Sequence, residues 1–270
     1  MRRFVALVLI VIALPVQVVH ADPTEILIRP DAATPAPVVN GRVDHGPWDA
    51  LLQRYVNDAG RVDYKTWKAK SRGELRHYLQ GMAAVDPGAL ADKDEQIAYW
   101  INVYNALTVH GMLEFYPTRS IKDHVSYVFG FHFWKDTKIK IGGKRHSLDA
   151  IEHRILRRMG EPRIHFAIVC ASIGCPRLWN HAYTGEGLGK QLDANARHFF
   201  AQAQNYRLDR GTNMLYLSSI FDWFGKDFGD GEGALRALAA RYVSSEDARY
   251  LKERTPKVEF LPYDWNINEQ

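Results

Sequence analysis

Residues 95–115, EQIAYWINVYNALTVHGMLEF, constrain the fold more than any other part of the chain. They are apolar nearly all the way round a helical wheel, whereas a surface helix keeps one polar face. Such a helix is stable where protein covers it on every side. Asp92 or Asp94 can cap its start, and Pro117 stops it. The pattern predicts a buried central helix over about 93–115, with the rest of the domain packed around it.

Two asparagines, Asn102 and Asn105, lie in this helix and share one sector of the wheel. A buried amide without partners costs about 1–3 kcal/mol, so polar groups must meet both side chains. One interpretation is a pair of substrate-binding amides that orient a ligand or stabilise an oxyanion. The other is a structural lock onto backbone groups of a neighbouring strand or hairpin.

Turn and cap signals divide the remaining chain into short elements. Gly142-Gly143 predicts a hairpin of 138–141 and 144–147, and Ser147 is a good N-cap for a helix over 148–159. The continuous apolar run 163–171 predicts a strand buried on both faces. We further expect helices at 48–57, 64–85, 186–204 and 232–243, a hairpin at 206–209 and 214–218, and a strand at 258–261. These elements predict a helix-rich α+β single domain.

The N-terminus has the pattern of a signal peptide over residues 1–21. Arg2 and Arg3 form a basic start, Phe4–Val16 is apolar, and Val19-His20-Ala21 is a small-x-small cleavage site. The apolar run is shorter than the roughly 18–20 residues that span a bilayer, so no membrane span is expected once the leader is removed. We therefore expect an exported protein, periplasmic or secreted. Residues 22–46 predict an extended, poorly ordered lead-in, and 47–270 a single globular domain.

The charge of the chain argues against one class of partner. The formal net charge of +4 falls to +2 without Arg2 and Arg3, and no run of Lys or Arg is present. A chain so close to neutral is not expected to bind nucleic acid. A small-molecule or peptide ligand remains the expected partner class.

The two cysteines, Cys170 and Cys175, are the most informative part of the composition. In an oxidising compartment they predict a disulfide that stiffens the corner after the buried run. One alternative is a nucleophilic thiolate at Cys170 or Cys175, and another is a redox-active pair, although the spacing is wider than C-x-x-C. On a regular strand His165 and Cys170 point to opposite faces, so the base for a thiol would come from elsewhere unless a bulge intervenes. His181, His153 and His110 are the other histidines considered as that base.

A carboxylate is the second candidate for chemistry. Glu152 lies about 40° from Leu148 on the wheel of the 148–159 helix, and so next to its apolar stripe. A carboxylate in that position is either paired, with an arginine or an indole N–H, or has a raised pKa and can act as a general base. His153 lies farther from the apolar stripe of this helix, so we expect it at the rim of a site and not inside it. No H-E-x-x-H or C-x-x-C frame is present, so neither a metal nor a cofactor is expected.

Five strings in this chain resemble a known family. They are AYWINVYNALTVH, GGKRHSLDAIEHRILR, EPRIHFAIVCASIGCP, LYLSSIFDWF with the following DF, and FLPYDWNIN. Over roughly residues 48–268 the chain resembles the domain of unknown function 547 (DUF547) family. Bacterial members of that family are often exported, in agreement with the leader. The resemblance implies a domain identity and motif positions at Asn102, Asn105, Glu152, His165, Cys170 and Cys175, but no reaction.

Two functional hypotheses follow from these residues. The first is an exported thiol- or carboxylate-dependent hydrolase or acyl-transferase that acts on a peptide-like substrate. Its candidate catalytic residues are Cys170, Cys175, His165, His181 and Glu152, with Asn102 and Asn105 as polarising amides. The second is a non-enzymatic periplasmic binding or scaffold module in which Cys170 and Cys175 form a structural disulfide.

Overall fold

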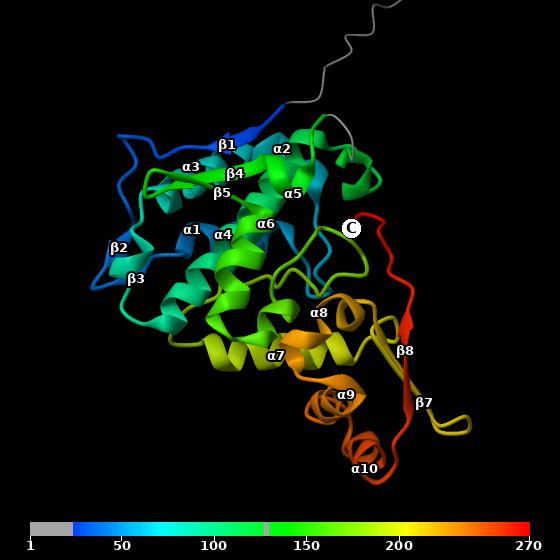
Figure 1. The fold of residues 1–270 in the computed structure, drawn as a ribbon. Helices are drawn as coiled ribbons and strands as arrows, with labels where there is room; N and C mark the ends of the chain where they lie inside the picture. Colours follow the sequence, from blue (N-terminus) through cyan, green and yellow to red (C-terminus); the bar gives the residue numbers. More distant parts are fainter. Residues whose placement is uncertain (1–23, 127–129) are drawn as a thin grey trace, which may run out of the picture.

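The central helix α4, Lys93–Phe115, passes through the middle of the molecule in the computed structural model, which describes residues 24–126 and 130–270 (Figure 1). Every residue from Ile97 to Leu113 is buried. The side chain of Asp92 accepts a hydrogen bond from the backbone N–H of Glu95 and caps the helix. The buried central helix is confirmed. The predicted leader, residues 1–21, lies outside the described residues.

Three helices cover one side of α4: α1 (Gly46–Tyr55), α2 (Tyr64–Lys70) and α3 (Arg72–Ala83). The continuous helix expected over 64–85 is interrupted at Ser71, which is buried and has φ −136°. Its hydroxyl group takes part in hydrogen bonds with Tyr55, Arg54 and Glu74. These side-chain contacts hold Ser71 in its non-helical conformation at the junction of α2 and α3.

The first sheet has the order β1-β4-β5, with β1 at Ile26–Ile28, β4 at Thr137–Ile141 and β5 at Lys144–Ser147. Its hairpin turns at Gly142-Gly143, as predicted, with φ 56° and 78°. Strand β1 belongs to the segment predicted to be a poorly ordered lead-in, yet it pairs in parallel with β4 and buries Ile26 and Ile28. The same segment contains the small hairpin of β2 (Val38–Val39) and β3 (Arg42–Val43). The lead-in is therefore more ordered than its composition predicts, because its few apolar residues pack on the domain.

Short helical turns flank the central helix. η1 (Pro87–Ala89) lies between α3 and α4, and η2 (Ile121–His124) and α5 (Phe133–Asp136) lie between α4 and β4. The helix predicted over 148–159 is present as α6 (Leu148–Ala150), a π-helical stretch η3 (Ile151–Leu156) and a 3₁₀ turn η4 (Arg157–Met159). The predicted cap is also present, because Ser147 Oγ accepts a hydrogen bond from the N–H of Ala150 at 3.1 Å.

The strand expected over 163–171 is wrong. Residues Pro162–Phe166 form the 3₁₀ helix η5, and the chain then runs through the core without strand pairing up to Ala171. Side-chain amides replace the missing ladder: Asn105 donates to the carbonyl of Ala167 at 2.9 Å and accepts from the N–H of Val169 at 3.0 Å. Apolar runs report burial, but they do not distinguish a strand from another buried conformation. Pro162 favours a helical start, which periodicity also misses.

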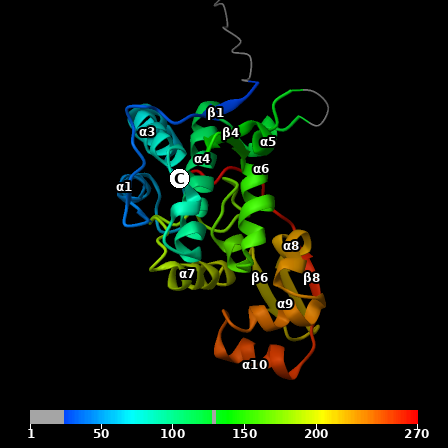
Figure 2. The same cartoon turned by 60° about the vertical axis from the view of Figure 1, so that its left-hand side comes forward.

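The last third of the chain forms the lower end of the molecule, as Figures 1 and 2 show. Helix α7 (Leu188–Phe200) crosses below α4, and the second sheet has the order β6-β7-β8, with β7 and β8 parallel. The remaining bounds are β6 Tyr206–Asp209, β7 Met214–Ser218, α8 Ile220–Phe228, α9 Gly231–Ala239, α10 Ser245–Glu253 and β8 Lys257–Leu261. The fold is helix-rich α+β, as expected. In the described ranges, no helix has both the length and the hydropathy needed to cross a membrane.

Candidate functional site

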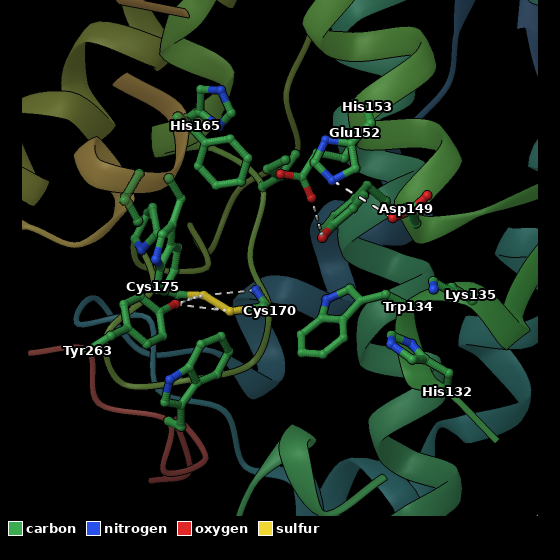
Figure 3. Close-up of a pocket in the computed structure, with 17 residues that line it drawn as sticks. His132, Trp134, Lys135, Asp149, Glu152, His153, His165, Cys170, Cys175 and Tyr263 are labelled. Atoms are coloured by element: carbon green, nitrogen blue, oxygen red, sulfur yellow. Dashed lines mark hydrogen bonds and ion pairs between the residues drawn. A yellow bond between two sulfur atoms is a disulfide. The ribbon is translucent and has the colours of Figure 1, made fainter. Parts of the chain in front are cut away.

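A cavity of about 320 Å³ opens beside the Cys170–Cys175 loop (Figure 3). Six separate parts of the chain line it: α4, α5 with the preceding His132, the 148–159 helical segment, η5 with the loop that follows it, α8 and the C-terminal segment after β8. Its walls are formed by Tyr104, His132, Trp134, Lys135, Asp149, Glu152, His153, His165, Ile168, Cys170, Cys175, Pro176, Ile220, Trp223, Phe224, Tyr263 and Trp265. Six of these residues are Trp, Tyr or Phe, and six others are His, Lys, Asp or Glu.

The two cysteines are joined as a disulfide in the cavity wall. The chain has no other cysteine. Ala171, directly after Cys170, has φ 57°, a left-handed conformation that costs a residue with a side chain about 1–2 kcal/mol. Two donors approach Sγ of Cys175 at 2.9 Å, the backbone N–H of Cys170 and the hydroxyl group of Tyr263. The structure therefore contains the disulfide, with its sulfurs beside a ligand-sized space.

Tyr263 reaches the disulfide because the C-terminal segment runs along the cysteine loop. The N–H of Gly174 donates to the carbonyl of Asp264, and the N–H of Ile173 donates to that of Asn266, each at 2.8 Å. A Cβ atom on Gly174 would lie 2.9 Å from the backbone nitrogen of Asp264 and 3.0 Å from the Tyr263 ring. Real Cβ contacts are longer, so the absence of a side chain at Gly174 permits this approach.

Glu152 lies in the π-helical stretch and presents its carboxyl group to the cavity. The hydroxyl group of Tyr104 donates to Oε2 of Glu152 at 3.2 Å (Figure 3). Burial raises the pKa of Glu152 to about 7, with smaller contributions from the charges of Asp149 and Asp227, against the opposing effects of the Tyr104 hydrogen bond and Arg157. π-Helical turns are frequent at functional sites. Glu152 is thus a carboxyl group that changes charge near neutral pH.

A second carboxylate, Asp227, lies behind the cavity and behaves in the opposite way. Arg157 donates to both of its oxygens, at 2.6 and 2.7 Å, and Nε2 of His165 lies 2.7 Å from Oδ2. These partners, Arg157 foremost, lower the pKa of Asp227 to about 2. Burial lowers the pKa of His165 despite the neighbouring Asp227. The buried imidazole donates a hydrogen bond from Nε2–H to the carboxylate, while its ring stacks on Phe224 at 4.4 Å.

The segment from 89 to 200 supplies α4, Glu152, His165 and the cysteine loop. Those residues match the family described as "Protein of unknown function, DUF547". The DUF547 resemblance expected from the sequence is confirmed there. Comparison with curated proteins and with solved structures found no significant match.

The five DUF547-like strings, which are far apart in the sequence, each contribute residues to the same cavity. Tyr104 comes from the first, Glu152 from the second and the cysteines from the third. Trp223 comes from the fourth string and Tyr263 from the fifth, both beyond the matched range. The cavity is therefore the place in the fold where the family-like sequence blocks meet.

Four of the predicted site residues are brought together in this cavity: Glu152, His165, Cys170 and Cys175. His181 does not line it; it lies on the surface with Nδ1 at 3.4 Å from Asp49 and from Gln53. His110 is also elsewhere, buried beside Glu114. His153 lies at the cavity, with Asp149 at 3.9 Å.

The two asparagines are outside the cavity lining, and backbone groups occupy both amides. Asn102 donates to the carbonyl of Tyr183 at 2.7 Å and accepts from its N–H at 3.0 Å. Asn105 donates to the carbonyl of Ala167 and accepts from the N–H of Val169. These contacts are those of the structural-lock interpretation. The geometry offers no amide of either asparagine to a ligand.

The candidate residues chosen from the sequence include none of the Trp, Tyr and Phe residues of the cavity wall. Tyr263 and Trp265 belong to the FLPYDWNIN string, so the family-like text could have identified them. Trp134 and Lys135 lie in a short helix without any motif, and no sequence signal marks them. Within residues 24–126 and 130–270, no group of three or more His, Cys, Asp or Glu side chains is arranged to hold a metal ion.

Proposed function

We propose that this chain is an exported, carboxylate-dependent hydrolase or acyl-transferase that acts on a peptide-like substrate. The single observation that carries the proposal is Glu152, a carboxyl group with a pKa of about 7 at an aromatic cavity. A general acid–base works best when its pKa lies near the working pH, because both protonation states are then populated. Ordinary surface carboxylates, with pKa values near 4, do not meet that requirement.

Glu152 would act first as a base and then as an acid. Its ionised carboxylate takes a proton from a water molecule, or from an acceptor hydroxyl or amine, as that group attacks the substrate carbonyl carbon. The protonated carboxyl then returns the proton to the leaving group as the carbonyl–heteroatom bond breaks. Tyr104 keeps the carboxyl oriented in both steps through its hydrogen bond to Oε2.

The aromatic rings of the cavity wall are suited to bind a ligand that has flat apolar and amide groups. Trp223 and Trp265 stack at 5.7 Å with an interplanar angle of 26°, and Tyr263 lies 4.5 Å from the Trp265 ring. Trp223 is 44% exposed, so one large aromatic surface is open to a ligand. Cavities of about 300–1,000 Å³ bind small molecules or a few residues of a peptide. The volume of about 320 Å³ lies at the lower end of that range.

The carboxylate form of the proposal is favoured over the thiol form. A thiol nucleophile needs a free cysteine, and both cysteines of this chain are in the disulfide. Neither His165 nor His181 is hydrogen-bonded to a sulfur in the described structure; His165 is bound to Asp227 and His181 lies by Asp49. Glu152, in contrast, can act as a general acid–base without reduction of the disulfide or movement of a histidine.

The test is a Glu152→Gln variant assayed against a panel of peptide amides and esters. The substitution keeps the size of the side chain and the capacity to accept from Tyr104, but removes the titrating group. We expect kcat/KM to fall about 10²–10⁴-fold, as for the loss of a general acid–base. Glu186→Gln, at an exposed glutamate outside the cavity, is the matched control and should retain full activity. Equal rates for the wild type and Glu152→Gln would overturn the proposal.

The second candidate, a non-enzymatic binding or scaffold module, rests on the same aromatic cavity. It predicts that peptides bind to the wild type without turnover. Under that hypothesis Glu152→Gln changes affinity alone, which calorimetry separates from a loss of turnover.

A further inference from the structure

The disulfide is placed where an external thiol can reach it. Structural disulfides are commonly covered by protein, but Cys170 is partly exposed and both cysteines line the aromatic cavity. Cys175 is the more buried of the two, with 7% of its surface exposed. An incoming thiolate therefore meets Sγ of Cys170 more readily than Sγ of Cys175.

Hydrogen-bond donors converge on the sulfur that such an attack would release. The backbone N–H of Cys170 and the hydroxyl group of Tyr263 each lie 2.9 Å from Sγ of Cys175, and the same hydroxyl is 3.0 Å from Sγ of Cys170. A disulfide sulfur is a weak acceptor, whereas a thiolate is a charged one. Donors already in place stabilise the thiolate far more than the disulfide. A stabilised thiolate is also the faster leaving group in thiol–disulfide exchange.

We propose that the Cys170–Cys175 disulfide is redox-active and exchanges with a dithiol that enters the aromatic cavity. A thiolate of the dithiol attacks Sγ of Cys170, a mixed disulfide forms, and the bond to Cys175 breaks with its electron pair on Cys175. The second thiol of the dithiol, once deprotonated, attacks the mixed disulfide and releases Cys170 as a thiolate. The dithiol is oxidised to a disulfide by two electrons, the cysteine pair is reduced by two, and two protons pass from the dithiol to the cysteines.

Tyr263 is the positioning residue of this exchange. Burial and the charge of Glu152 raise the pKa of Tyr263, so the phenol keeps its proton and remains a donor at all working pH values. The phenol is held at the sulfurs by the contact of the C-terminal segment with Gly174. The exchange does not use Glu152 as a reacting group, so it can occur whether or not the proposed hydrolase activity is present.

The first experiment measures reduction of the folded, full-length mature protein by dithiothreitol, with iodoacetamide quenching and mass mapping of Cys170 and Cys175. We expect reduction while circular dichroism stays native, at a rate above that of global unfolding. A disulfide that is reduced only as the protein unfolds would overturn the proposal. Glutathione disulfide is the second probe: in Cys175→Ser, the remaining Cys170 thiolate should attack it, release one glutathione as a thiolate and form a stable mixed disulfide. With Cys170→Ser, the covered Cys175 should react more slowly. Equal reactivity of the two variants would contradict attack at Cys170.

The second experiment tests the role of the Tyr263 hydroxyl group. Tyr263→Phe removes one donor to the leaving sulfur, and we expect reduction to slow by about tenfold, the usual effect of losing one hydrogen bond to a charged group. The same variant should raise the pKa of the Cys175 thiol in the reduced protein. Tyr250→Phe is the matched control, because its hydroxyl group bonds to Arg210 and Asn213, away from the cavity. Unchanged rates and thiol pKa in Tyr263→Phe would show that the hydroxyl group does not assist the exchange.

Discussion

The hydroxyl group of Tyr263 lies 2.9 Å from Sγ of Cys175, although 88 residues separate them in the chain. The contact exists because the segment after β8 returns across the molecule and runs along the cysteine loop. It closes the aromatic cavity opposite Glu152 (Figure 3). The proposed site thus depends on both the middle and the very end of the sequence.

The close approach of the C-terminal segment predicts a strong effect at Gly174. In Gly174→Ala the new Cβ would collide with the Tyr263 ring and the backbone of Asp264, so the segment must shift. We expect a loss of about 1–3 kcal/mol in the free energy of unfolding, as for overpacking, together with slower reduction of the disulfide. Chemical denaturation measures the first effect. Gly189→Ala is the control, since no atom lies within 4 Å of its Cβ and the residue is helical; it should be neutral or stabilising.

The asparagine lock predicts a stability effect at Asn105. Asn105→Ala leaves the carbonyl of Ala167 and the N–H of Val169 without their partner in the core. We expect a cost of about 1–3 kcal/mol for each buried group, measured by urea denaturation. Asn180→Ala, which removes an exposed amide bound to Asp58, should change stability by no more than about 0.5 kcal/mol. An Asn105→Ala protein of unchanged stability that no longer binds ligand would instead support the substrate-binding interpretation.

The cluster around Asp227 predicts acid sensitivity. The pKa of Asp227 is lowered from 3.8 to about 2 in the folded state, so the folded protein binds its proton less readily than the unfolded chain does. The resulting stabilisation is complete above pH 4 and is lost as the pH falls towards 2. Allowing for solvent screening, it amounts to about 1–2 kcal/mol. Unfolding free energies measured between pH 2 and 5 should show this slope in the wild type and a reduced slope in Asp227→Asn.

Glu152 predicts a pH dependence of the opposite sign. Its pKa is raised from 4.5 to about 7, so between those values the folded state holds a proton that the unfolded chain has released. Stability therefore decreases as the pH rises through this window and stays low above it. Glu152→Gln removes the effect, and we expect it to be about 2–3 kcal/mol more stable relative to the wild type at pH 8 than at pH 4. A constant difference across the window would mean that the carboxyl group has an ordinary pKa.

The sequence predicts the parts of this fold that depend on local pattern. The burial of α4 follows from its apolar surface, the hairpin turn from Gly142-Gly143, and the start of the 148–159 segment from the Ser147 cap. The apolar residues of the run 163–171 predict that it is buried. They do not predict which groups bind its backbone, because those groups come from distant parts of the sequence. Asn105 and Asn195 satisfy those groups from distant helices.

In the candidate site too, local sequence patterns predict some residues, whereas others depend on long-range contacts. Glu152, His165 and the two cysteines stand in recognisable strings, and the wheel position of Glu152 alone suggests a perturbed carboxylate. The wall opposite Glu152 cannot be inferred in this way. Tyr263 reaches the disulfide through long-range pairing at Gly174, and no periodicity in the sequence encodes that contact.

The measurement that tests the central claim most directly is a carboxyl-carbon NMR titration of Glu152 in the folded protein. Glu152→Gln assigns the resonance by its absence. The account predicts a midpoint near pH 7, well above the ordinary glutamate value of 4.5. A midpoint at or below 4.5 would contradict it, because Glu152 would then be a permanently ionised side chain at neutral pH and could not serve as the proton-transfer group of the cavity.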